Sequence, residues 1–234
     1  MNTINDYLTQ RISTFDTQSL AKQFARHQLL VMDNFLPQEF VLQHYVPEIE
    51  QCNSRINRVY VAGFKKSGSV SAQLLKHHGP KLHHLYHNDA MQQFIAHVVR
   101  QSLFLCPEVD PHAVALYYYT EQGDHIGFHY DKSFYRGKRY TVLLGLVQDS
   151  VHSNLICYPE GKHSQPLTVV TKPGTLVMFN GDVLWHKVSP LGENERRVIL
   201  TLEYVTDTRM SVINKYISNF KDRFLYFGKP QYAN

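Results

Sequence analysis

Residues 123–131 read Gly-Asp-His-Ile-Gly-Phe-His-Tyr-Asp, and this stretch lies within the half of the chain that contains most of its strand-like segments. Side chains two positions apart in an extended segment project to the same side. His129 and Asp131 can therefore bind one metal ion from the end of a strand. A His-x-Asp pair is common by chance, so the prediction of a metal site depends on ligands elsewhere in the chain.

A third candidate ligand is His186, which follows the apolar segment 175–179 and its Pro173-Gly174 turn. We expect His186 on a turn beyond that strand. Two imidazoles and one carboxylate on one face of an octahedron leave three open positions, as in non-haem Fe(II) oxygenases. Those positions admit a bidentate oxoacid and then O2. Other histidines of this half are interpreted as surface residues or neighbours of the ligands: His112, His125, His152 and His163.

An oxoacid such as 2-oxoglutarate carries a second carboxylate, which needs a cation, and Arg offers a planar bidentate partner. Arg197 begins an alternating segment in which it shares one face with Ile199, Thr201 and Glu203. Polar residues on a shared face predict a polar interior. Arg196 is the competing partner, and we prefer Arg197 because it is in phase with the other polar residues.

Short strand-like segments surround the motif from Pro111 onward, at 113–119, 140–147, 154–158, 167–170, 175–179 and 198–205. Many short strands separated by turns predict an antiparallel sandwich or jelly roll. We expect a β-rich α+β fold in one domain, 1–234, because a barrel of this size is often undivided. Residues 1–110 would be mainly helical support, 111–206 the jelly-roll core, and 207–234 a C-terminal helix and tail, with the helix at 210–220.

The N-terminal half reads mainly as helices with a few short strands. Apolar spacing predicts helices at 17–27 and 89–101, the second capped by residue 88 or 89, and Pro37 suits the start of a helix that runs towards Cys52. Residues 29–32 and 59–63 are expected to be strands. Residues 67–69 are expected to form a turn or a loop.

Composition restricts the classes of partner and compartment. The net charge is +4, with Lys and Arg scattered rather than clustered, so we expect no nucleic-acid partner. Three separated Cys residues form no CxxC pair, which argues against a disulfide framework or zinc site and suits a reducing compartment. With neither a signal-like start nor a membrane-length apolar run, we expect a cytoplasmic protein without a membrane partner. The oligomeric state stays open.

The sequence resembles the Fe(II)/2-oxoglutarate dioxygenase superfamily, which has a double-stranded β-helix (a jelly roll, cupin-like), clearly over 111–205 and more loosely before it. Three segments are similar to those of the carrier-free radical halogenases of free amino acids and their hydroxylase relatives: 124–131 (DHIGFHYD), 139–146 (RYTVLLGL) and 179–186 (FNGDVLWH). Residues 203–206 (EYVT) also fit. The resemblance implies Fe(II) as cofactor, with 2-oxoglutarate and O2 as cosubstrates that yield succinate and CO2.

The resemblance also separates two chemistries. The halogenases of that group replace the ligand carboxylate with a small residue, which opens a coordination position for chloride. This sequence keeps Asp131, whose carboxylate would occupy the halide's position. We therefore expect hydroxylation of an unactivated C–H bond rather than halogenation.

Further site residues are predicted by their place relative to the ligands. Tyr119 lies where related enzymes often place a residue that contacts 2-oxoglutarate, although core packing is the alternative. Thr201 is a second cosubstrate candidate. Glu203 is the main substrate candidate: a carboxylate inside the barrel needs a partner, which is a substrate ammonium, Arg139 or Lys187. Trp185 and Asn180 are interpreted as shaping the substrate pocket, with packing as the alternative.

A small free molecule, above all a free amino acid and one such as lysine, is therefore the expected substrate. Lys65, Lys66 and residues 67–71 are candidates for a lid that contacts a substrate carboxylate, with a solvated loop as the alternative. Hydroxylation of a protein or peptide side chain is the competing activity. A nucleic-acid demethylase and a non-catalytic sensor are further alternatives; the scattered charge argues against the first, and the complete ligand set against the second.

Overall fold

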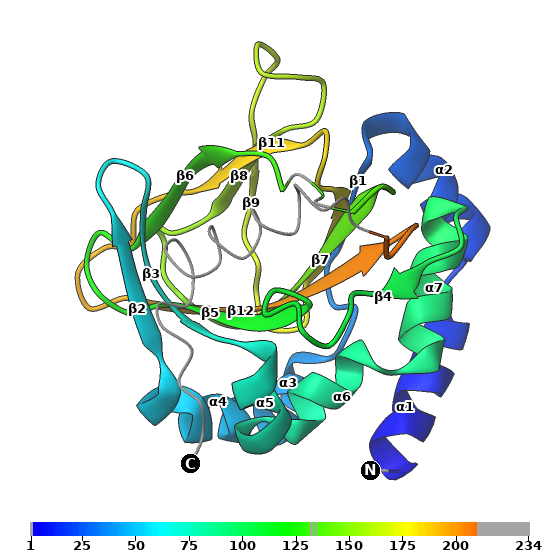
Figure 1. The fold of residues 1–234 in the computed structure, drawn as a ribbon, viewed down its shortest axis with the longest axis horizontal. Coiled ribbons are helices and arrows are strands. Elements are labelled where there is room, and N and C mark those ends of the chain that lie inside the picture. The colour runs from blue at the N-terminus through cyan, green and yellow to red at the C-terminus, as the bar shows by residue number, and fades with distance from the viewer. Residues whose placement is uncertain (1, 132, 134, 210–234) are drawn as a thin grey trace.

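The computed structural model describes residues 2–131, 133 and 135–209, which form a nearly closed antiparallel barrel with helices packed against it. Helices α1, α2 and α7 stand at one side of the barrel, and α3 to α6 lie beneath the layer that contains β5 and β12 (Figure 1). The helices are α1 (Asn2–Ser13), α2 (Thr17–His27), α3 (Gln38–His44), α4 (Val46–Cys52), α5 (Ala72–His78), α6 (Pro80–Tyr86) and α7 (Asp89–Val99). No helix among these residues is both long and apolar enough to cross a membrane.

The strands make one sheet whose order departs strongly from their order in the chain. They are β1 (Leu29–Met32), β2 (Asn57–Val61), β3 (Lys65–Val70), β4 (Phe104–Leu105), β5 (Val114–Tyr119), β6 (His125–His129), β7 (Arg139–Asp149), β8 (Leu155–Tyr158), β9 (Leu167–Val169), β10 (Leu176–Asn180), β11 (Trp185–Val188) and β12 (Arg196–Val205). The main path is β1-β10-β7-β12-β5-β3-β6-β11-β8-β9, with β2 on β3 and β4 on β12. This arrangement confirms the predicted jelly-roll fold.

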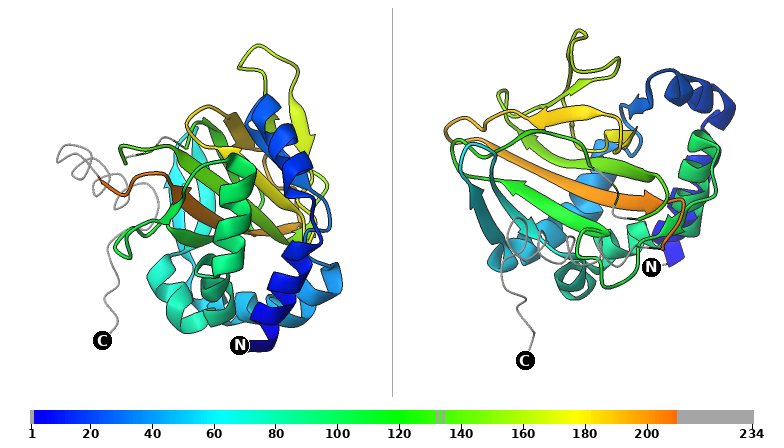
Figure 2. Two further views of the ribbon diagram at one scale, coloured as in Figure 1. Left: turned by 90° about the vertical axis from the view of Figure 1, so that its right-hand side faces the viewer. Right: turned by 45° about the horizontal axis from the view of Figure 1, so that its top comes forward.

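Side-chain packing closes the barrel where backbone pairing does not. The two ends of the strand path are β1 and β9, and Leu29 of β1 and Val169 of β9 belong to one buried apolar cluster with Phe179 and Leu184. Burial of these apolar groups stabilises the packing of this part of the barrel. The turned views in Figure 2 show the strands enclosing a common interior, with the helices on the outside.

Strand β12 separates the two sides of the sheet. Its outward residues Val198, Leu200 and Leu202 are fully buried in the apolar core that the helices cover. Its alternate residues Arg197 and Glu203 are also buried but face the interior with polar groups. The alternation predicted for this segment is therefore present, and it gives the barrel an apolar outer layer and a partly polar inside.

Most predicted elements are present, and three predictions need correction. The helix expected from Pro37 to Cys52 is two helices, broken at Tyr45, because Pro47 is favoured in the first turn of a new helix. Residues 67–69 are not a turn but part of β3. The N-terminal half contributes β1, β2 and β3 to the barrel, so support and core are not divided at residue 110. The helix predicted at 210–220 lies outside the described residues.

Candidate metal centre

The two histidines face each other across paired strands. His129 ends β6 and His186 lies in β11, and their Cα atoms are register partners. The register shifts between this pair and the next, Val188 with Ile126, as in a β-bulge. The bulge reverses the alternation, so that Ile126 and His129 both point inward. His186 is thus in a strand and not on the predicted turn.

Three side chains converge on one point inside the barrel. Ligand atoms of His129, Asp131 and His186 all lie within 4.8 Å of one another. The Asp131 carboxylate is 3.2 Å from His129 Nε2 through Oδ1 and 3.6 Å from His186 Nε2 through Oδ2. In each imidazole, Nδ1 lies 2.8–3.0 Å from a backbone carbonyl, that of Gly127 or Leu184. Such a bond orients the ring and leaves Nε2 free to bind a metal.

The electrostatics of this cluster suit a cation. Burial lowers the pKa of His186, an effect that the neighbouring Asp131 partly opposes. Burial would raise the pKa of Asp131, but the neighbouring His186 and His129 outweigh that effect and hold it below its usual value. A metal binds neutral imidazoles and an ionised carboxylate. The side chains therefore fit a divalent transition-metal ion.

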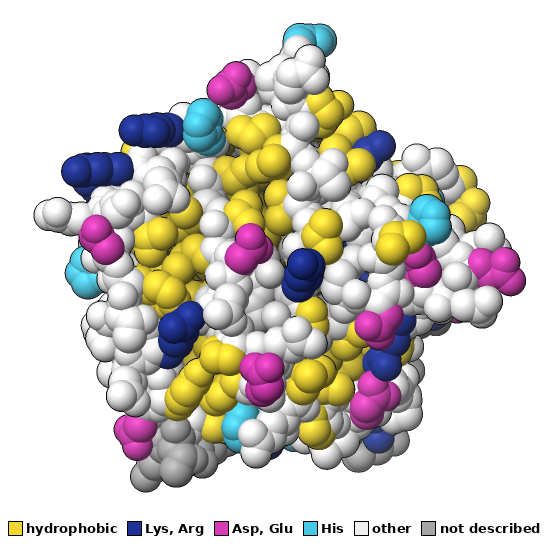
Figure 3. Space-filling view, turned by 180° about the vertical axis from the view of Figure 1, so that it is seen from behind, with side chains coloured by type: hydrophobic (Ala, Val, Ile, Leu, Met, Phe, Trp, Pro, Cys, Tyr) yellow, Lys and Arg dark blue, Asp and Glu magenta, His cyan; other side chains and the backbone are white. Residues whose placement is uncertain are grey.

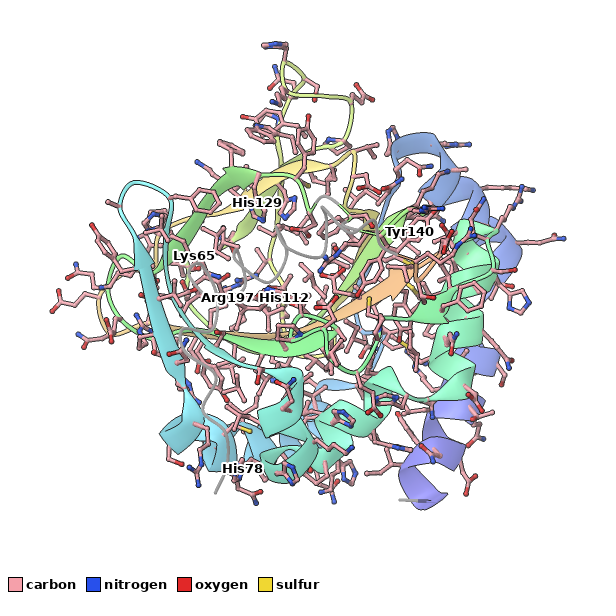
Figure 4. All side chains as sticks on the ribbon, in the orientation of Figure 1. Lys65, His78, His112, His129, Tyr140 and Arg197 are labelled. Carbon is pink, nitrogen blue, oxygen red and sulfur yellow. The ribbon has the colours of Figure 1, made fainter. Side chains whose placement is uncertain are left out.

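Arg197 lies inside the barrel near this cluster, as Figure 4 shows for Arg197, His129 and Lys65. Its side chain is 1% exposed, and Nε and Nη2 donate to the Thr171 hydroxyl at 3.3 and 3.1 Å. Its Nη1 has no hydrogen-bond partner among the residues that the structure describes. Burial lowers the pKa of Arg197, an effect that Tyr119 opposes. A buried guanidinium with an unused donor fits an anionic ligand.

The neighbours of Arg197 agree with its predicted place. Tyr119 is its register partner on β5, and the guanidinium lies 5.0 Å from the centre of the Tyr119 ring. Arg196, the alternative, points outward and forms an ion pair with Glu50 at 2.7 Å. Thr201 lies on the same face of β12 as Arg197 and is 7% exposed. The structure thus brings Arg197, Tyr119 and Thr201 to the barrel interior.

Glu203 has a protein partner. Of the partners left open by the sequence, Arg139 makes the contact, with Nε 2.8 Å from Glu203 Oε2. Burial raises the pKa of Glu203 to about 7, an effect that Arg139 partly offsets. Burial would lower the pKa of Arg139, but Glu203 outweighs it and raises that pKa. Glu203 therefore belongs to a buried ion pair through Oε2, and its contact with a substrate ammonium stays a prediction.

Two predicted pocket residues point away from the metal-binding side chains. Trp185 alternates with His186 along β11 and stacks on the Phe128 ring, with centroids 5.6 Å apart and planes 9° apart. The Lys162 ammonium lies 3.9 Å from the centre of the Trp185 ring. Asn180 uses its amide within a turn: Oδ1 accepts from the backbone of Asp182 and Nδ2 donates to Gln28. The packing interpretation fits both better than a place in the substrate pocket.

Sequence reasoning missed or misplaced several interior residues. Lys65, Ser67 and Ser69 alternate along β3 and are at most 2% exposed. The Lys65 ammonium lies 5.0 Å from the centre of the Tyr117 ring. Because Gly68 interrupts this polar segment, the sequence pattern is typical of a loop. The Lys-x-Ser-x-Ser alternation, however, indicates a strand with a polar inner face.

Comparisons with known proteins agree with this geometry. The model of the Halogenase D family matches residues 12–136, more than half of the 234-residue chain, and the match includes His129 and Asp131 but not His186. No curated protein matches the sequence.

Solved structures with the same fold include three oxygenase-type enzymes at low identity. The non-haem alpha-ketoglutarate-dependent epimerase SnoN from nogalamycin biosynthesis has a TM-score of 0.66 at 14% identity, covering 80% of this chain and 81% of that chain. A prolyl-4-hydroxylase from Pseudomonas putida has a TM-score of 0.61 at 15% identity, covering 82% and 98%. A prolyl hydroxylase from Trichoplax adhaerens, in complex with a hypoxia inducible factor peptide fragment, has a TM-score of 0.63 at 15% identity, covering 91% and 96%.

The two kinds of comparison support different statements. SnoN has also been solved with Fe3+ and alpha-ketoglutarate, yet identities this low establish a shared fold rather than a shared activity. The family model is matched over most of the N-terminal half and through the His-x-Asp motif. The chain, with the fold of Fe(II)/2-oxoglutarate oxygenases, belongs to the Halogenase D family.

Proposed function

We propose that this protein is an Fe(II)- and 2-oxoglutarate-dependent hydroxylase of a small free molecule. The observation that carries the proposal is the convergence of His129, Asp131 and His186 inside a barrel that also buries Arg197. Two imidazoles and a carboxylate are the facial ligand set of non-haem iron oxygenases. Iron and 2-oxoglutarate bound there supply the oxidant: 2-oxoglutarate, O2 and the substrate C–H bond give succinate, CO2 and the alcohol.

The residues of the chain have separate tasks in this proposal. His129, Asp131 and His186 would hold the metal ion. Arg197 binds the remote carboxylate of 2-oxoglutarate through its unused donor. Tyr119 lies beside Arg197, and Thr201 lies further along the same face of β12; we assign both to the cosubstrate site. Because Arg197 is buried, a charge-assisted contact that it makes is stronger than it would be at the surface.

Hydroxylation rather than halogenation is proposed because the third ligand is a carboxylate. Asp131 lies between the two imidazoles, 3.2 and 3.6 Å from their Nε2 atoms. A halide would need the position that this carboxylate takes. Family membership alone does not decide between the two reactions.

The proposed substrate is a free amino acid. Lys65, on β3, is a further buried cation inside the barrel, and we assign it to the substrate carboxylate. Glu203 is paired with Arg139 through Oε2, and we assign its other oxygen to the substrate ammonium. On the face shown in Figure 3, Lys and Arg side chains are interspersed with acidic ones, and no basic stripe for nucleic acid is seen there.

The test is a screen for succinate release from Fe(II), 2-oxoglutarate and each free amino acid, followed by mass spectrometry of the product. We expect one amino acid to stimulate succinate release and to gain the mass of one oxygen atom. Asp131→Ala is expected to abolish the reaction. A chlorinated product in the presence of chloride would refute the role given to Asp131.

Peptide hydroxylation is the competing activity, since two structures with this fold are prolyl hydroxylases. Succinate release that responds to peptides but to no free amino acid would replace the proposed substrate class. Failure to consume 2-oxoglutarate with either pool would refute the enzymatic proposal.

A further inference from the structure

We infer that Thr141 is a positioning residue for the Asp131 carboxylate and that the buried Arg139–Glu203 ion pair, by neutralising Glu203, leaves the Thr141 hydroxyl proton for Asp131. The inference rests on the proposed metal centre and concerns a chain of hydrogen-bonding contacts next to Asp131. The Thr141 hydroxyl lies 3.0 Å from Asp131 Oδ2 and 3.0 Å from Glu203 Oε2. Arg139 completes the chain at 2.8 Å from the same Glu203 oxygen.

The chain of contacts connects elements that are not neighbours in the sheet. Thr141 of β7 and Glu203 of β12 are register partners, so their side chains lie together on the inner face. Asp131 directly follows β6, which is separated from β7 and β12 by other strands in the order of the sheet. The Thr141 hydroxyl therefore ties the segment after the His-x-Asp motif to the opposite wall of the barrel.

A threonine hydroxyl has one proton, so it can donate to only one of the two carboxylates at a time. The guanidinium of Arg139 already donates to Glu203 and neutralises its charge. Asp131 Oδ2 is therefore the acceptor that gains more from the hydroxyl. With Oδ2 engaged in this way, ligation of a metal through the other oxygen, Oδ1, is favoured.

The backbone closes the other side of Asp131. A Cβ atom built on Gly181 would lie 2.8 Å from the Asp131 Cβ and from its carbonyl oxygen, and 3.2 Å from the Thr141 hydroxyl. Such separations are shorter than ordinary van der Waals contact. Asp131 is thus confined between the glycine backbone and the Thr141 hydroxyl, which restricts rotation of its side chain. Hydrogen-bonded neighbours of metal ligands typically change metal affinity by roughly 10- to 100-fold.

The experiment measures Co(II) binding to the full chain without 2-oxoglutarate, by calorimetry and by the visible absorption of bound Co(II). Thr141→Val removes the hydroxyl at nearly constant volume, and Thr141→Ala is the second variant in case the valine is not accommodated. Thr141→Ser keeps the hydroxyl. Thr175→Val is the matched control, because Thr175 is 2% exposed and lies at the start of β10, away from the cluster.

Thr141→Val and Thr141→Ala should weaken Co(II) binding by about 10- to 100-fold and change the absorption spectrum. Thr141→Ser and Thr175→Val should bind and absorb as the wild type does, and all four should unfold cooperatively. Wild-type affinity and spectrum in both hydroxyl-free variants would overturn the inference while leaving the proposed metal centre standing. Absence of Co(II) binding by the wild type would overturn both.

Discussion

Substitution of two buried arginines is expected to affect protein stability and ligand binding in opposite ways. Arg197 is 1% exposed and leaves Nη1 without a hydrogen-bond partner among the described residues, whereas Arg139 is 9% exposed and pairs with Glu203 at 2.8 Å. We consider Arg197→Met and Arg139→Met, because methionine replaces the length of the side chain without its charge and adapts to irregular space. The two variants remove the same group from different electrostatic surroundings.

For Arg197→Met, the free protein should lose little stability. The lost hydrogen bonds to Thr171 contribute about 1 kcal/mol, and removal of a buried charge without a counter-ion offsets that loss. A net change within about 1 kcal/mol shifts Tm by no more than about 2–4 °C in a domain of this size. Binding of 2-oxoglutarate should weaken by about 2–5 kcal/mol, the typical cost of truncating a buried charged partner. That range corresponds to roughly 30- to 4,000-fold in Kd.

For Arg139→Met, the free protein should lose stability. The variant leaves the Glu203 carboxylate buried without its cation, which costs about 3–5 kcal/mol. Tm should fall by roughly 6–20 °C. Burial already raises the pKa of Glu203 to about 7, and loss of Arg139 would raise it further. Protonation of Glu203 would then relieve the unpaired charge, so the deficit relative to the wild type should shrink as the pH falls.

Differential scanning calorimetry of both variants, with and without saturating 2-oxoglutarate and Co(II), measures the Tm of the free protein and its increase on ligand binding. At a 2-oxoglutarate concentration of 100 times Kd, binding should raise the free energy of unfolding of the wild-type protein by about 2.7 kcal/mol. Arg197→Met should not show this stabilisation. A fall in the Tm of free Arg197→Met as large as that of Arg139→Met would show that Arg197 is a structural residue. Unchanged 2-oxoglutarate affinity in Arg197→Met would refute its assignment to the cosubstrate.

Three further predictions concern the same interior and one distant histidine. Gly181→Ala should weaken Co(II) binding at least about 10-fold, because its Cβ would displace Asp131; wild-type affinity in a titration would contradict the confinement. Tyr119→Phe removes the hydroxyl of a ring whose centre lies 5.0 Å from the Arg197 guanidinium, so Kd for 2-oxoglutarate should rise by about 5- to 10-fold; equal affinity by calorimetry would assign Tyr119 to packing. Burial lowers the pKa of His83 from 6.5 to about 4, so the unfolded chain binds the proton first and stability falls as pH drops from 6.5 towards 4. Thermal unfolding over this pH range should show a smaller loss of stability in His83→Gln than in the wild type. Identical pH profiles would show that His83 does not cause the loss.

The sequence alone was sufficient for features that depend on local alternation. The inward placement of Arg197 rather than Arg196 follows from the period of two along β12, and it agrees with the burial of Arg197 and the partial exposure of Arg196. The pairing of His129 with Asp131 likewise needs only their spacing of two. Such patterns are local, because the direction of a side chain along a strand depends on its immediate backbone.

Tertiary structure decided the features that depend on which strands meet. Pairing of β6 with β11 brings His129 opposite His186, and alternation along β11 turns Trp185 outward onto Phe128. Pairing of β3 with β5 and β6 converts a polar segment that looked like a loop into an inner wall with Lys65. The choice of Arg139 as the partner of Glu203, and of Thr141 as the contact of Asp131, arises from strands distant in the chain. These contacts are non-local: the sequence provides the charged groups, but only the packing of the barrel determines which of them lie within hydrogen-bonding distance.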